Sequence, residues 1–137
     1  MSAFVDVDVE IKNETALVNA LRRMGYEQLR HGRQKLVGYQ GDQRKEEADI
    51  VVDRRHLTSA SNDLGFRKEE GGKWKMIISE YDKSALSRKH EGGFEKQFKS
   101  AYSVEVSKLA LKKQKYKVTE TVQDDGTVEL VAVRWAK

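Results

Sequence analysis

Residues 116–135 read YKVTETVQDDGTVELVAVRW, and this stretch decides the fold class. Apolar and polar residues alternate on both sides of Asp124-Asp125-Gly126, which is the period of two β-strands flanking a tight turn. A glycine at the third turn position supplies the positive φ that such a turn requires. The stretch therefore predicts an antiparallel hairpin. Its second strand is apolar on both faces, which predicts a central position in a sheet.

Working outward from the hairpin, two segments have apolar residues at helical spacing. Residues 94–114 predict a long helix, with a buried stripe formed by Phe94, Phe98, Ala101, Tyr102, Val106 and Leu109. Asn13 is a typical N-cap for a shorter helix that ends near Gly25. The buried stripe of this shorter helix is expected to contain Leu17, Ala20, Leu21 and Met24.

The remaining segments predict strands and polar connections. Residues 4–12 alternate strictly and predict a strand with one wet face. Further extended segments are expected at 27–39, 48–53, 62–68 and 73–81, with polar or charged loops at 42–47, 54–61 and 82–93. Most links between successive expected strands are short enough for hairpins. We therefore expect one α+β domain over residues 1–137, with a single, mainly antiparallel sheet and two helices packed on one face. The order of elements also allows a pseudo-duplicated arrangement.

Composition excludes several classes of function. The 137 residues include no cysteine, so disulfides and thiolate chemistry are absent. No apolar run approaches the roughly 20 residues that cross a bilayer, and acids interrupt the N-terminal pattern, so we expect a cytoplasmic protein without membrane contact. Residues 83–117 contain ten Lys or Arg and three acids, a charge of +7 against +4 for the whole chain. The remainder is therefore −3, and the long helix is the basic part of the molecule.

Four short segments, in this order along the chain, resemble the hypothetical chloroplast reading frame thirty-five family, a domain of unknown function found in plastids, cyanobacteria and other bacteria. The segments are VGYQG at 37–41, ADIVV at 48–52, DLGFR at 63–67, and VQDDG at 122–126 followed by Arg134-Trp135. Asp124 departs from the glutamate usual in that family, and the second helix is unusually rich in lysine. The resemblance implies no catalytic residues. Because members occur near AAA-type ATPases, it implies an accessory role beside such a partner.

The basic helix is the first candidate contact surface. Its lysines are expected mostly on the open side of the helix, where they would meet phosphates or an acidic protein, or would only be solvated. Exposed aromatic residues are sparse there, so stacking on bases is unsupported. The candidate contact residues are Lys96, Lys99, Lys108, Lys112, Lys113 and Lys115.

A second candidate is a recognition loop or ligand site that contains Tyr39, Gln40, Asp63 and Arg67. The GYQG segment lacks the Gly-Lys-Ser/Thr ending of a phosphate loop, so a strand end with two glycines is the competing interpretation. An Asp63–Arg67 pair would be structural.

Other titratable residues do not predict a metal or cofactor site. The acids of residues 6–10 follow one strand face, and a single strand cannot close a metal shell. His31, His56 and His90 are scattered and are expected in loops or on the surface.

Three functions compete on these observations. We favour a non-enzymatic accessory or adaptor protein that docks on a larger protein, through the open face of the sheet or through the basic helix. The alternatives are a nucleic-acid-binding module that uses the same helix, and a small-ligand binder or enzyme with its site near Tyr39.

Overall fold

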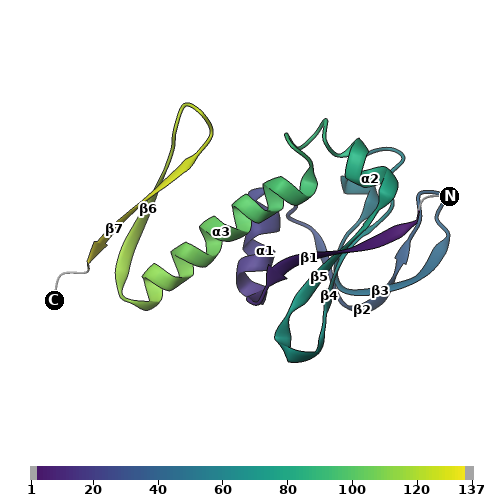
Figure 1. The fold of residues 1–137 in the computed structure, drawn as a ribbon, viewed down its shortest axis with the longest axis horizontal. Helices are drawn as coiled ribbons and strands as arrows, with labels where there is room; N and C mark the ends of the chain where they lie inside the picture. The colour runs from purple at the N-terminus through teal and green to yellow at the C-terminus, as the bar shows by residue number, and fades with distance from the viewer. Residues whose placement is uncertain (1–2, 135–137) are drawn as a thin grey trace.

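The computed structural model describes residues 3–134, which form an α+β fold (Figure 1). The elements in chain order are β1 (Phe4–Ile11), α1 (Glu14–Arg23), β2 (Leu29–Val37), β3 (Gln43–Val52), η1 (Arg54–His56), β4 (Leu64–Lys68), η2 (Glu70–Gly72), β5 (Trp74–Ser79), α2 (Glu80–Ala85), α3 (Phe94–Lys113), β6 (Tyr116–Val122) and β7 (Val128–Arg134).

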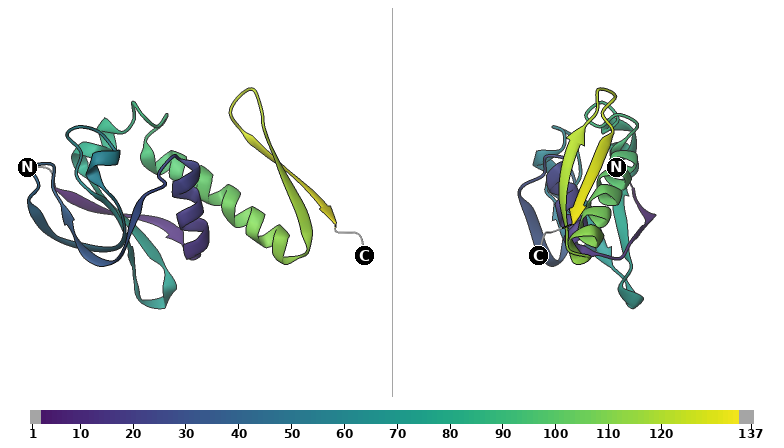
Figure 2. Two further views of the ribbon diagram at one scale, coloured as in Figure 1. Left: turned by 180° about the vertical axis from the view of Figure 1, so that it is seen from behind. Right: turned by 90° about the vertical axis from the view of Figure 1, so that its left-hand side faces the viewer.

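The body of the molecule is an antiparallel sheet in the order β1-β5-β4-β3-β2, with α1 and α3 against one face (Figures 1 and 2). This arrangement confirms the predicted fold class. The main core lies between that face and the helices. Its largest fully buried side chains include Leu17 and Leu21 from α1, Phe94 and Phe98 from α3, and Phe66 from β4.

The corner between β1 and α1 fixes the position of α3. Asn13 caps α1 as expected, because its Oδ1 accepts a hydrogen bond from Ala16 N at 2.9 Å. The backbone N–H groups of Lys12 and Asn13 donate to the hydroxyl of Tyr102 at 3.0 and 3.1 Å. A tyrosine of α3 therefore satisfies two donors at the start of α1 and holds the helices together.

The second face of the sheet carries a smaller core of Leu36, Ala48, Val51 and Ile77. Gly65 lies beneath it, where a Cβ would approach Ala48 Cβ at 2.6 Å. Nearer β1, this face carries charge: the Arg67 guanidinium contacts Asp6 and Glu69, each at 2.9 Å. The face expected to dock a partner is thus a small buried cluster with ion pairs beside it.

The final hairpin forms as predicted, but its placement in the sheet was wrong. β6 and β7 pair only with each other, as a separate two-stranded sheet within the described residues. α3 has 20 residues and is about 30 Å long, and it carries the hairpin away from the body (Figures 1 and 2). The expected pseudo-duplication is not realised either, because β2 and β3 lie in the main sheet whereas β6 and β7 do not.

Two connections also differ from expectation. Residues 43–47, expected as a solvated loop, are the first half of β3, because pairing with β2 outweighs their polar composition. The polar segment after β5 begins with the short helix α2, whose N-cap is Ser79. Trp135, expected at the end of the hairpin, lies outside the described residues.

Candidate binding groove

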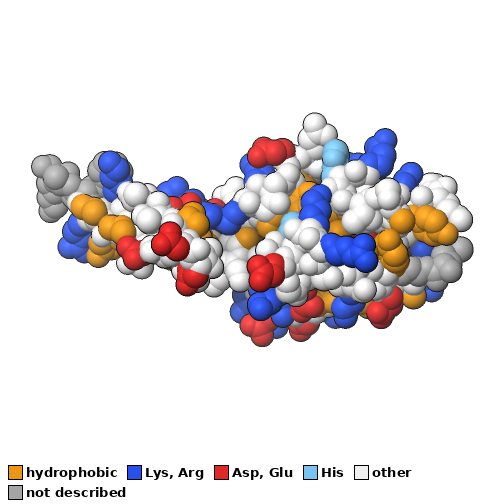
Figure 3. Space-filling model, turned by 90° about the horizontal axis from the view of Figure 1, so that it is seen from above, with side chains coloured by type: hydrophobic (Ala, Val, Ile, Leu, Met, Phe, Trp, Pro, Cys, Tyr) orange, Lys and Arg blue, Asp and Glu red, His pale blue; other side chains and the backbone are white. Residues whose placement is uncertain are grey.

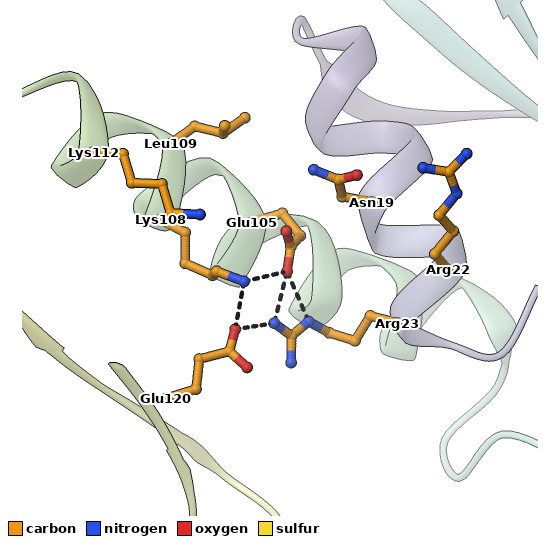
Figure 4. A pocket seen from close by; sticks show the side chains of 8 residues that line it. All are labelled: Asn19, Arg22, Arg23, Glu105, Lys108, Leu109, Lys112 and Glu120. Carbon is orange, nitrogen blue, oxygen red and sulfur yellow. Dashed lines mark hydrogen bonds and ion pairs between the residues drawn. The ribbon is translucent and has the colours of Figure 1, made fainter. Parts of the chain in front are cut away.

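An open groove lies where α1, α3 and β6 meet, with a volume of about 500 Å³ (Figure 4). The residues that line the groove are Asn19, Arg22, Arg23, Glu105, Lys108, Leu109, Lys112 and Glu120. Four of them carry positive charge and two carry negative charge, so the lining has a net charge of +2.

A four-residue ion-pair cluster forms one wall of the groove and joins all three elements (Figure 4). Arg23 donates to Glu105 Oε2 from Nε at 3.0 Å and from Nη2 at 2.6 Å, and Nη2 also contacts Glu120. Lys108 Nζ lies 2.8 Å from Glu120 Oε1 and 3.6 Å from Glu105 Oε2. The cluster is the main polar link between the hairpin and the body.

Electrostatics favour the ionised form of Glu120 within this cluster. The ammonium of Lys108, and then the guanidinium of Arg23, lower the pKa of Glu120 below its usual value. The side chain of Glu105 is only 7% exposed and lies against the same two cations. Arg23 and Lys108 are therefore neutralised within the protein.

The other two cations of the groove have no acidic partner. Arg22 and Lys112 are both exposed, and neither side chain makes an ion pair or hydrogen bond with any residue in the described range 3–134. The lining therefore includes a guanidinium from α1 and an ammonium from α3 that are available to an acidic ligand, with the amide of Asn19 between them in the view of Figure 4.

The predicted lysine surface is divided by the structure. Lys108 and Lys112 line the groove, and Lys108 is half-buried, whereas the other five candidate lysines are exposed. Lys99 pairs with Glu95 at 2.9 Å, and the Lys96 side chain lies over Gly92. The remaining two, Lys113 and Lys115, are exposed at the end of α3.

The predicted recognition loop is held by backbone contacts. Tyr39 is 42% exposed; its N–H donates to Asn62 Oδ1, and its hydroxyl accepts from Gln40 Nε2, each at 3.0 Å. Asp63 is buried and accepts from Val37 N at 2.9 Å and Arg54 N at 2.8 Å.

Asp63 and Arg67 do not pair with each other. Asp63 pairs with Arg30 at 2.5 Å, whereas Arg67 faces the other acids described above. Asp63 thus joins β2, β4 and the start of η1, and the structure does not bring Arg67 together with the Tyr39 loop.

The three histidines lie in loops or at exposed positions as expected, but the loop residue His90 is buried. His31 and His56 are exposed, but His90 is only 4% exposed. Its Nε2 lies 2.5 Å from the Tyr26 hydroxyl and its Nδ1 lies 2.7 Å from Gln97 Oε1. Over the residues 3–134, no group of three or more His, Asp or Glu side chains is placed to hold a metal ion.

Sequence reasoning missed Arg22, Arg23, Glu105 and Glu120 as neighbours. The available signal was Glu105, which follows Ala101 by four residues on the buried stripe of α3. A carboxylate on a buried stripe requires a cation from another element.

Fold and groove together define a small α+β protein with a charged surface groove. The chain belongs to a family of proteins of unknown function, DUF1257, whose model matches residues 20–131. The matched range includes every residue that lines the groove except Asn19. Neither the curated proteins nor the solved structures contain a match to the chain. No helix within the described residues has the length and apolar character needed to cross a bilayer.

Proposed function

We propose that the chain is a non-enzymatic accessory protein that binds an acidic segment of a larger protein in the α1–α3–β6 groove. The observation that carries this proposal is the presence of Arg22 and Lys112, two unpaired cations, beside a cluster whose other charges are already satisfied. A carboxylate that binds there gains charge-assisted hydrogen bonds without breaking any existing ion pair.

The distribution of lysines favours a protein partner over nucleic acid. At about 100° per residue, Lys96 and Lys112 lie about 160° apart around the α3 axis. A nucleic-acid backbone would require a continuous basic stripe, and Lys99 is already paired with Glu95. A short acidic peptide requires only the two cations of the groove that have no acidic partner.

The family resemblance narrows the proposal. We place the chain in the branch that contains the plastid reading frame thirty-five proteins, in the cytoplasm, with an AAA-type ATPase as the candidate partner. The motifs at residues 37–41, 48–52, 63–67 and 122–126 support this placement, and the occurrence of family members near such ATPases supports the partner.

Titration with two defined probes tests the groove. A short polyglutamate peptide and a single-stranded oligonucleotide of equal charge are added to the full chain at about 50 mM salt, where electrostatic binding is strong. We expect the peptide to bind, and the double variant Arg22→Glu/Lys112→Glu to weaken its affinity at least tenfold, which corresponds to about 1.4 kcal/mol.

The matched control is Lys96→Glu/Lys99→Glu, which changes the net charge equally but lies outside the groove. It should leave most of the affinity for the peptide intact. Equal loss in both variants would show that only net charge matters, and tighter binding of the oligonucleotide than of the peptide would favour the nucleic-acid function.

A further inference from the structure

The β6–β7 hairpin exposes more apolar surface than the strands of the body. None of its residues is buried, and Val122, Val131 and Val133 are 67%, 41% and 58% exposed. A two-stranded sheet alone is marginally stable in water. Figure 3 shows hydrophobic side chains on the narrow end of the molecule that the hairpin forms. β7 therefore has the composition of an interior strand without the neighbours of one.

The free edge of β7 also lacks the protection found at the two edges of the main sheet. β1 has acids along its wet face and a bulge after Asp8, and β2 has Gly32 and two register shifts. β7 pairs with β6 in unbroken register and has no charged side chain from Leu130 to Val133. Protected edges prevent pairing between chains, and the outer edge of β7 lacks such protection.

Hydrogen bonding identifies which backbone groups are available on β7. The turn closes with Gln123 N donating to Thr127 O at 2.8 Å, so inward and outward groups alternate along the strand from that pair. Val131 bonds to β6, and Leu130 and Ala132 direct their N–H and C=O groups to the free edge.

We propose that two copies of this chain pair through β7, antiparallel about a two-fold axis, to form a four-stranded sheet between molecules. Full overlap of the seven-residue strand places Val131 on the axis. The charges fit this arrangement. The turn of the hairpin is acidic, with Asp124 and Asp125, and the opposite end, next to α3, carries Lys115 and Arg134. Antiparallel pairing sets the acidic turn of one copy beside the basic base of the other.

The surface area of the chain agrees with a dimer. The accessible surface is 8464 Å² for a mass of 15.7 kDa. A globular monomer of that mass exposes about 7,300 Å², so the projecting helix and hairpin add about 1,200 Å². A standard interface buries about 800 Å² per partner, and the excess is large enough to supply it.

Sedimentation equilibrium of the full chain tests the pairing. We expect a species of twice 15.7 kDa that falls to one chain mass in Ala132→Pro, which removes an outward N–H and leaves the bonds to β6 intact. Val131→Lys should also give one chain mass, because it sets like charges against each other on the axis. Val106→Lys is the matched control, since that valine on α3 is 37% exposed, and it should remain dimeric.

Single cysteines locate the axis, because the natural chain has none. Leu130→Cys, Val131→Cys and Ala132→Cys are oxidised one at a time, and cross-linking is expected to be fastest at Val131→Cys, which faces its own copy on the axis, and absent at Thr119→Cys on β6. A monomeric wild-type chain would overturn the proposal. A dimer that persists in Ala132→Pro, or that cross-links at none of the three positions, would overturn it as well.

The proposed dimer interface does not include the residues of the groove. Arg22→Glu/Lys112→Glu should leave the sedimenting mass unchanged, and Ala132→Pro should retain the affinity for the acidic peptide. Failure of either proposal can therefore be distinguished from failure of the other.

Discussion

Arg23 connects three elements through one guanidinium, because it contacts Glu105 on α3 and Glu120 on β6. In Arg23→Ala, the nearly buried Glu105 keeps only Lys108, at 3.6 Å. Since the arginine itself is partly exposed, we expect a loss of about 1–2 kcal/mol in the free energy of unfolding. Urea denaturation measures it, and Arg22→Ala, at an exposed residue without a partner, should change it by less than about 0.5 kcal/mol. Equal losses would contradict a structural role for the cluster.

His90 makes stability depend on pH. Burial lowers its pKa, although the hydrogen bond to Gln97 acts in the opposite direction and Lys89 adds to the lowering. Because Gln97 Oε1 only accepts, Nδ1 donates to it, and Nε2 accepts from Tyr26, whose pKa burial raises to about 12. The folded state therefore holds neutral imidazole, and protonation would place a second donor against the hydroxyl.

The sign of the pH dependence follows from that lowered pKa. As the pH falls, the unfolded state binds the proton first, near the ordinary histidine pKa of about 6.5. The contribution of His90 to the free energy of unfolding is therefore complete above this pH and declines below it. One proton contributes at most about 1.4 kcal/mol per pH unit. Denaturant titrations across this range should show a slope that His90→Gln removes and that His56→Gln, at an exposed position, retains. A slope that survives in His90→Gln would exclude His90 as its source.

At the scale of elements, Gly65 sets how closely β2 and β3 approach β4. A Cβ there would lie 2.6 Å from Ala48 Cβ and 2.9 Å from Leu36 Cδ2. Gly65→Ala should therefore cost about 1–3 kcal/mol through overpacking. In a double-mutant cycle of unfolding free energies, Gly65→Ala/Ala48→Gly should be about 1 kcal/mol more stable than the sum of the two single changes predicts. Strict additivity of the two changes would show that the contact does not limit the packing.

The sequence predicts the elements that carry their own periodic pattern. The capped helix α1, the long helix α3 and the β6–β7 hairpin all form near the expected residues, because local spacing and turn chemistry define them. The first half of β3 was not predictable in this way, since its charged residues become a strand only by pairing with β2. The groove was not predictable either, because it joins residues of three elements whose distances only the tertiary structure sets.

The position of the hairpin shows a similar limit. An apolar pattern on both faces of β7 indicates that the strand prefers neighbours, but it does not say which molecule provides them. Within one chain, the 20-residue α3 places the hairpin beyond the reach of the main sheet. The pattern is therefore consistent with the proposed pairing between copies.

The whole molecule is a packed α+β body with a charged groove and a projecting hairpin, and we propose that its outer surface performs its function. Three tagged forms should be compared by pull-down from the native host: the natural chain, Arg22→Glu/Lys112→Glu, and Lys96→Glu/Lys99→Glu. We predict that one protein with an acidic segment is retained by the natural chain and by the Lys96/Lys99 variant, and is lost from the groove variant. Retention of the same protein by all three forms, or recovery of nucleic acid in its place, would contradict the account.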